Sequence, residues 1–205
     1  CEDFVKAIED GTGLDLKQFR LWYSQAGTPQ VSVSLTHEGS TATLKLTQKV
    51  PATPRQPDKQ PMPIPLRVAL FDRDSGAHAG EKLIVLDKPS DTFTFDGFAK
   101  PPVLSINRGF SAPIILESNQ SAEELAFLSA HDDDPFARFE AMQQLMTHYL
   151  TAKISGTPVD RDIILLAIAR ILADPSLDPA FLAEIILLPS EAFLGDQMVE
   201  VDPQA

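Results

Sequence analysis

The sequence predicts a β + α chain with more than one domain, in which an immunoglobulin-like antiparallel β-sandwich precedes the start of an α-helical domain built from stacked hairpins. Two observations predict this fold class. Apolar and polar residues alternate between residues 30 and 118, as in half-buried strands, and after Ser118 the apolar residues recur every three to four positions, as in helices. With 205 residues, of which 43% are hydrophobic, the chain is long enough to bury a core without disulfides.

Residues 1–26 carry helical periodicity. Apolar residues three to four apart predict two helices, formed around Phe4, Val5 and Ile8, and then around Leu16, Phe19, Trp22 and Tyr23. Asp15 is expected to cap the second helix. Gly27 and Pro29 are expected to end it, because glycine adopts the left-handed conformation and proline cannot continue a helical turn.

Residues 27–119 have the pattern of a sandwich domain. Seven runs have the length and the β-branched or aromatic content of strands, at residues 31–35, 43–50, 64–72, 81–87, 91–98, 103–110 and 112–118. In the fifth run Phe93 and Phe95 are expected to share one face, opposite Thr92 and Thr94. Seven short strands in fewer than ninety residues are typical of an immunoglobulin-like sandwich.

A proline-rich segment, residues 51–65, separates the second and third runs. It contains six of the seventeen prolines, which excludes a helix and the interior of a sheet. We expect an extended surface connection between the sheets. A ligand for a proline-binding module is the alternative interpretation.

Residues 120–205 are predicted to be helical. Four helix starts have capping residues, namely Ser121 with Glu124, Asp134 with Pro135, Asp160, and Asp178 with Pro179. Short loops at 155–159 and 174–177 indicate antiparallel neighbours. The last apolar residues, Phe193, Leu194, Met198 and Val199, resemble a helix face without a partner, so we expect the helical domain to continue beyond Ala205.

Charge and cysteine content exclude several classes of function. Acidic residues outnumber basic ones 29 to 17, and the net charge of −12 disfavours binding to nucleic acid or to anionic membranes. Cys1 is the single cysteine, so an internal disulfide is impossible. The first residues do not have the pattern of a signal peptide, and the apolar run 163–169 is too short to span a bilayer. We therefore expect a soluble, cytoplasmic protein.

Candidate catalytic residues are sparse. The four histidines, His37, His78, His131 and His148, lack the spacing of a zinc site, and no nucleophile-elbow motif is present. The acidic run 131–138 is interpreted as a helix start, with a bound cation as the alternative. Residues 72–76 are interpreted as a turn, with a calcium contact as the alternative, and Met142, Met146 and Tyr149 as core rather than a ligand surface. No catalytic, cofactor-binding or metal-ligating residue is assigned.

Several motifs resemble a known family. The first is carried by Asp15, Leu16, Phe19, Arg20, Trp22, Tyr23, Ser24, Gln25, Gly27, Thr28 and Pro29, and the similarity continues through residues 47–72, 109–117, 127–145 and 178–190. In these residues the chain is similar to bacterial aminopeptidase N, a family of gluzincin-type zinc metallopeptidases.

The resemblance implies an internal segment of a four-part enzyme. By comparison, residues 1–26 correspond to the last helices of the catalytic domain, 27–119 to the β-sandwich, and 120–205 to the first helices of the C-terminal domain. The family's zinc ligands and catalytic residues precede this segment. The resemblance therefore implies zinc and peptide substrates for the longer parent, an inactive segment here, and other domains of the same chain as its partners.

Three functions follow as hypotheses. In the first, the segment spaces and positions the helical domain against the catalytic domain. In the second, the sandwich is a module that binds a peptide or protein at an open strand edge. In the third, the chain is an independent hydrolase with an unfamiliar site.

Overall fold

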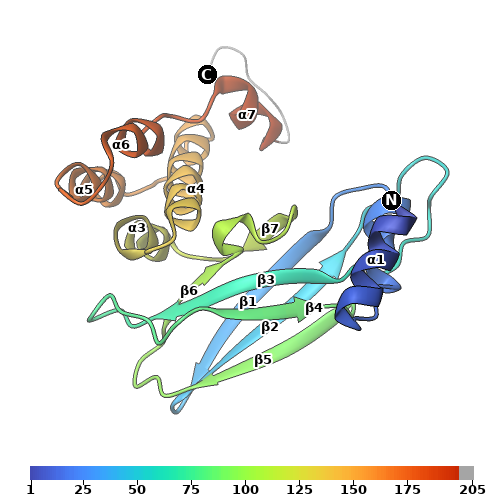
Figure 1. Ribbon diagram of the computed structural model, residues 1–205. Helices are drawn as coiled ribbons and strands as arrows, with labels where there is room; N and C mark the ends of the chain where they lie inside the picture. The colour runs from blue at the N-terminus through green and yellow to red at the C-terminus, as the bar shows by residue number, and fades with distance from the viewer. Residues whose placement is uncertain (199–205) are drawn as a thin grey trace. The chain divides into compact units, whose positions relative to one another are not determined.

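The computed structural model describes residues 1–198 and divides the chain into two compact units (Figure 1). The first unit comprises Cys1–Asp72 and His78–Asn119, and the second comprises Arg73–Ala77 and Gln120–Ala205. The middle of the loop between the third and fourth strands thus belongs to the second unit rather than to the unit of the strands that it connects.

The first N-terminal helix forms around the predicted residues, whereas the second differs from the prediction. Helix α1 spans Glu2–Thr12 and ends at Gly13, whose φ of 72° is left-handed. The second segment is shorter than predicted, with a 3₁₀ turn η1 at Gln18–Arg20 and helix α2 at Leu21–Ser24. Asp15 does not cap it, because its carboxylate accepts a hydrogen bond from the Lys17 N–H, 3.0 Å away, in a local turn that competes with helix formation.

The first unit is an immunoglobulin-like sandwich of two sheets, as predicted. The seven strands are β1 Gln30–Glu38, β2 Thr41–Lys49, β3 Ile64–Phe71, β4 Lys82–Leu86, β5 Ser90–Asp96, β6 Val103–Ile106 and β7 Ile115–Ser118. One sheet has the order β5-β2-β1-β7 and the other β4-β3-β6. The prediction of a wholly antiparallel fold was wrong in one place, because β7 pairs parallel with β1.

The sixth strand is shorter than the predicted run 103–110. Asn107 adopts φ 59°, which no extended strand allows, and the 3₁₀ turn η2 follows at Arg108–Phe110. The sandwich core is formed by alternate residues of the strands, including Val31, Leu44, Leu46, Ile64, Leu66, Val68 and Leu86. Phe95 is buried and Phe93 packs against the same core, which confirms their shared face.

The second unit contains the helices α3 Ala122–His131, α4 Pro135–Ile154, α5 Arg161–Leu172, α6 Pro179–Ile185 and α7 Glu191–Asp196. All four predicted caps are confirmed, including the reciprocal capping box of Ser121 and Glu124. In α4, Met142 and Met146 are fully buried, which confirms their place in the core.

The end of the second unit matches the prediction in part. Leu194 of α7 is buried, whereas Phe193 stays half exposed. Met198 is the last described residue, and Val199 lies outside the described residues. Within residues 1–198, no helix has both the length and the apolar content needed to cross a membrane.

Candidate functional site

The four histidines are dispersed over the two units. In the first unit His37 Nε2 lies 2.9 Å from the carbonyl oxygen of Phe98, and the His78 ring packs 4.7 Å from that of Phe71. In the second unit the His131 ring packs on Phe127, and His148 is exposed on α4. Among the described residues, no three histidine, cysteine, aspartate or glutamate side chains form a group that could hold a metal ion.

The acidic run 131–138 is a junction between two helices. The backbone N–H of Asp132 donates the hydrogen bond that ends α3. The Asp132 carboxylate accepts a hydrogen bond from the Asp134 N–H at 2.9 Å. Asp134 in turn caps α4 by accepting from the Ala137 N–H at 2.8 Å. These contacts confirm the interpretation as a helix start.

Residues 72–76 form a turn, as predicted, and residues 73–77 belong to the second unit. Arg73 forms an ion pair with Glu124 of the capping box. Gly76 has φ 70°, and a Cβ built on it would lie 3.0 Å from Nδ1 of His131, so glycine is required there on both conformational and steric grounds.

The most extensive polar contact in the first unit joins residues 18–26 to the proline-rich segment, and we call it the helix–loop junction. Trp22 donates its indole N–H to the carbonyl of Pro63 at 2.9 Å. Gln18 donates to the carbonyls of Pro61 and Asp87 at 3.0 and 2.6 Å. Proline carbonyls outside a sheet have no ladder partner, so side chains of the preceding helix satisfy them instead.

Glutamine side chains complete the helix–loop junction. Gln25 and the backbone of Gln60 exchange two hydrogen bonds of 2.9 and 2.8 Å. Gln56 likewise donates to the Ser24 carbonyl and accepts from the Ala26 N–H. The proline-rich segment is thus held along its length by residues that precede the first strand, as expected for a structural connection.

Gln48 holds the same segment from inside the sandwich. Its side chain is 9% exposed. Its amide oxygen accepts from the Met62 N–H at 2.8 Å, and its amide nitrogen lies within 3.0 Å of the carbonyls of Met62, Leu86 and Lys88. One buried amide therefore connects β2 to the start of β3 and to the end of β4.

Arg20 fixes α1 to the helix–loop junction. Its guanidinium donates to Glu9 at 2.8 and 2.9 Å and to Glu2 at 2.7 Å. Hydrogen bonds from Arg20, and then from the Leu16 N–H, lower the pKa of Glu9 from 4.5 to about 2. The lowered pKa means that this contact contributes stability that is present above pH 4.5 and is lost as pH falls through about 2.

Replacing Arg20 with glutamine is therefore expected to return the pKa of Glu9 from about 2 toward 4.5, because its largest source of stabilisation is removed. Carboxyl ¹³C chemical shifts followed through an acid titration measure this change. Lys6→Gln, which removes a charge from the same helix, is the matched control and should leave the pKa of Glu9 low. An unchanged Glu9 titration in Arg20→Gln would contradict the assignment.

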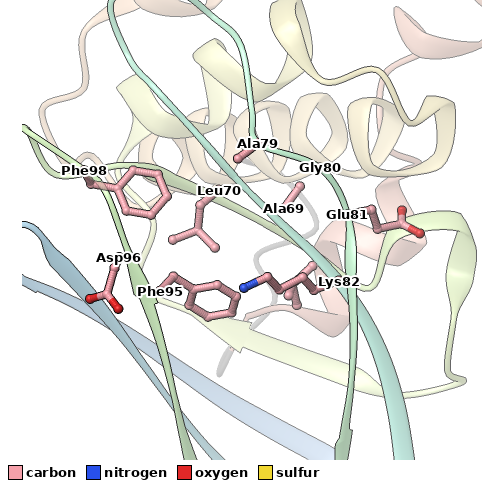
Figure 2. A pocket seen from close by; sticks show the side chains of 10 residues that line it. Ala69, Leu70, Ala79, Gly80, Glu81, Lys82, Phe95, Asp96 and Phe98 are labelled. Atoms are coloured by element: carbon pink, nitrogen blue, oxygen red, sulfur yellow. The ribbon is translucent and has the colours of Figure 1, made fainter.

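A small cavity lies elsewhere in the sandwich, where β3, the segment leading into β4, and the end of β5 meet (Figure 2). Its volume is about 170 Å³, and its walls combine aromatic, aliphatic and charged side chains. The largest groups that Figure 2 labels there are Leu70, Lys82, Phe95 and Phe98.

Sequence reasoning named Trp22, Gln25 and Phe95, but it missed the contacts of the helix–loop junction and the presence of this cavity. Gln48 and Lys82 occupy ordinary strand positions, and Gln25 lies 35 residues from its partner. No local pattern marks such contacts, because their partners are distant in the sequence.

Comparisons with known proteins agree with this architecture. Residues 27–119 match the family described as a domain of unknown function (DUF3458) with an Ig-like fold, and residues 122–205 match its companion DUF3458_C, described as ARM repeats. Aminopeptidase N of Escherichia coli K12 is 36% identical over 219 residues, covering 100% of this chain and 25% of that protein. Aminopeptidase N of Haemophilus influenzae is 33% identical, covering 99% of this chain and 25% of that protein.

A solved structure is also similar. The crystal structure of Legionella pneumophila aminopeptidase A in complex with aspartic acid has a TM-score of 0.85 and 28% identity, covering 98% of this chain and 23% of that one. Fold and matches together define an Ig-like β domain followed by ARM-type helical repeats. The chain is a relative of bacterial aminopeptidase N and spans about a quarter of the length of the curated relatives that it matches.

Proposed function

We propose that this chain is a non-catalytic segment of a zinc-dependent aminopeptidase, and that it positions the helical domain relative to the catalytic domain while the enzyme removes N-terminal residues from peptides. The similarity to two aminopeptidases N over the whole chain supports a peptidase as parent. The described residues offer no group suited to zinc, so no step of peptide hydrolysis is assigned to them.

The helix–loop junction is the observation that carries this proposal. A spacer transmits orientation only if its connections resist bending, and α2 is fixed to the sandwich by side-chain hydrogen bonds at both ends. Trp22 and Gln18 hold the proline-rich segment near β3, while Gln25 and Gln56 hold its middle. Each such bond contributes about 1 kcal/mol, so together they oppose rotation of the helix on the sandwich.

Exposed apolar side chains in residues 1–26 support a contact between this segment and the catalytic domain. Phe4, Leu14 and Tyr23 are 65%, 58% and 52% exposed, although the rest of the first unit buries most of its large apolar side chains. Large apolar side chains left exposed in this way favour a contact with another domain. We assign that contact to the catalytic domain of the same polypeptide, and we place the enzyme in the cytoplasm, since Cys1 alone forms no internal disulfide.

A chimera tests the positioning role. Residues 1–205 replace the matched segment of Escherichia coli aminopeptidase N, and hydrolysis of alanyl p-nitroanilide is measured. Gln25→Ala with Gln56→Ala in this chimera is expected to lower kcat/KM about tenfold, because small displacements of a catalytic assembly cost one to two orders of magnitude in rate.

Lys45→Ala with Lys49→Ala is the matched control, since both lysines are exposed on β2, and it should retain the activity of the chimera. Equal kcat/KM in the glutamine variant and in the chimera would contradict the positioning role. Turnover by residues 1–205 alone that persists with a chelator would contradict the non-catalytic assignment.

A further inference from the structure

The cavity of the sandwich lies at an interruption in the pairing of β3 with β4. The regular ladder begins at Val68 opposite Lys82, and an isolated bridge joins Phe71 to His78. Between these two points β3 contributes residues 69–70, whereas the facing segment contributes residues 79–81. The extra residue is a β-bulge, and it moves the segment away from β3.

Gly80 makes this bulge possible. Its φ of 118° is a conformation that side-chain-bearing residues rarely adopt. Nothing lies within 4 Å of a Cβ built on it, so the space beside the glycine is open. The backbone conformation of the bulge therefore requires glycine, whereas the packing around it leaves room for a side chain.

The bulge leaves backbone hydrogen-bonding groups beside the cavity. In an antiparallel strand the N–H and C=O of one residue point to the same neighbour, and successive residues alternate between neighbours. Either Ala69 or Leu70 therefore points its backbone N–H and C=O toward the bulge, whereas the other residue points these groups toward β6 on the other side of β3.

The size and walls of the cavity match an aromatic ring. Its volume of about 170 Å³ is close to that of engineered cavities of about 150 Å³ that hold benzene. Leu70 and Phe95 are 5% and 7% exposed, and Phe98 is half-buried (Figure 2). Aromatic rings pack favourably edge to face against such walls.

Lys82 supplies a positive charge at the same place. It lies on the face of β4 that also carries Ile84 and Leu86, and its Nζ is 4.8 Å from the centroid of the Phe95 ring. Within the part of the chain that the structure describes, Lys82 forms no ion pair with a carboxylate.

The neighbouring carboxylates are already engaged. Glu81 lies 3.7 Å from both Arg67 and Arg108, and Asp96 accepts a hydrogen bond of 2.6 Å from Thr41. Glu81 and Asp96 thus both have partners in the described part of the chain, whereas Lys82, the basic residue of the cavity lining, has no counter-ion there. A carboxylate on the ligand is favoured next to Lys82.

Strand β4 is at the edge of its sheet, so an extended ligand can pair with its backbone. The sheet order is β4-β3-β6, so one side of β4 has no neighbouring strand in that sheet. Leu83 and Val85 on its outer face are 64% and 47% exposed. Exposed edge strands bind extended peptides through the backbone and select them through side-chain pockets.

We propose that the free edge of β4 binds an extended peptide segment whose aromatic side chain fills the cavity and whose neighbouring carboxylate pairs with Lys82. This binding is separate from the positioning role, because the helix–loop junction uses other residues. The proposed ligands of the sandwich are therefore peptide segments in which an acidic residue lies next to an aromatic one.

Titration of ¹⁵N-labelled chain 1–205 with the hexapeptide TVFEVT, acetylated and amidated, tests this proposal. Saturable shifts are expected in the amide signals of residues 79–84 and 95–98, with a Kd on the order of 1 mM. The peptide TVAEVT is expected to bind at least tenfold more weakly, because it lacks the ring. No saturation up to about 5 mM, equal binding of TVAEVT, or shifts centred on other residues would each overturn the proposal.

A double-mutant cycle tests the contact with Lys82. Lys82→Ala is expected to weaken TVFEVT about fivefold and to leave TVFQVT unchanged, because only the former carries the carboxylate. Lys45→Ala on β2 is the matched control and should bind both peptides like the unaltered chain. Since Lys82 is exposed, Lys82→Ala should leave the fold intact, which unchanged Trp22 fluorescence would show. Equal weakening of the binding of both peptides would overturn the assigned ion pair.

Discussion

Replacing Gln48 with leucine is expected to destabilise the first unit by about 4 kcal/mol. The substitution keeps the size of the side chain but removes the buried amide that serves the Met62 N–H and the carbonyls of Met62, Leu86 and Lys88. Each buried polar group left without a partner costs about 1–3 kcal/mol. Leucine offers no hydrogen bond in return, so the losses add up over several groups.

Trp22 provides the measurement for this variant. It is the only tryptophan, and it lies in the first unit, so its fluorescence during urea denaturation follows the unfolding of that unit without a contribution from the second unit. Lys49→Leu places the same side chain at the next, exposed position of β2 and is expected to change stability by less than about 0.5 kcal/mol. A loss below about 1 kcal/mol in Gln48→Leu would contradict the role given to the amide.

Replacing Arg138 with leucine is expected to destabilise the second unit by about 3 kcal/mol. Arg138 is 8% exposed and donates to the Ser129 carbonyl at 2.7 Å and to the Asp174 carboxylate at 3.1 Å. It therefore ties the last turn of α3 to the start of α4 and to the residues after α5. Removing one partner of a largely buried charge-assisted contact leaves the other partners unsatisfied.

Far-ultraviolet circular dichroism during urea denaturation measures the Arg138→Leu effect, because the helices dominate that signal. Arg161→Leu is the matched control, since the Arg161 side chain is 70% exposed and lies at a helix start. It is expected to stay within about 0.5 kcal/mol of the unaltered chain. Equal losses of unfolding free energy in Arg138→Leu and Arg161→Leu would contradict the role given to the buried contacts of Arg138.

The same contact predicts a pH dependence. Hydrogen bonds from Ser176, and then from Arg138, lower the pKa of Asp174 below its usual 3.8. A lowered pKa contributes stability that is present above pH 3.8 and is lost as pH falls below it. Arg138→Leu should therefore show a smaller loss of stability between pH 4 and pH 2 than the unaltered chain shows.

Local patterns predicted the boundaries of most elements. Asp134 followed by Pro135 starts α4 in the sequence and in the structure, because a capping carboxylate and a proline at the first turn act on immediately adjacent backbone groups. The same reasoning fails at Asp15, whose carboxylate bonds the Lys17 N–H in a turn before η1 begins. A capping residue predicts a helix start only where it has no competing local hydrogen bond.

The candidate site was much less predictable. Gln48 lies on a strand and looks like any half-buried polar residue, yet its amide reaches carbonyls 14, 38 and 40 residues away. The predicted turn covered only residues 72–76, and nothing in the sequence placed Phe95 and Lys82 on the walls of one cavity.

The sequence alone determined that the strands of the sandwich precede the helices α3 to α6, where those helices begin, and that the chain resembles aminopeptidase N. The order of the elements and the helix starts depend on side-chain periodicity and on capping, both of which act within a few residues along the chain, whereas the resemblance depends on the motif residues themselves. Only the tertiary structure decided that β7 runs parallel to β1, that amides hold the proline-rich segment, and that a bulge opens a cavity beside Lys82. Such features depend on which distant segments become neighbours, and that is set by the packing of the whole sandwich core rather than by any local pattern.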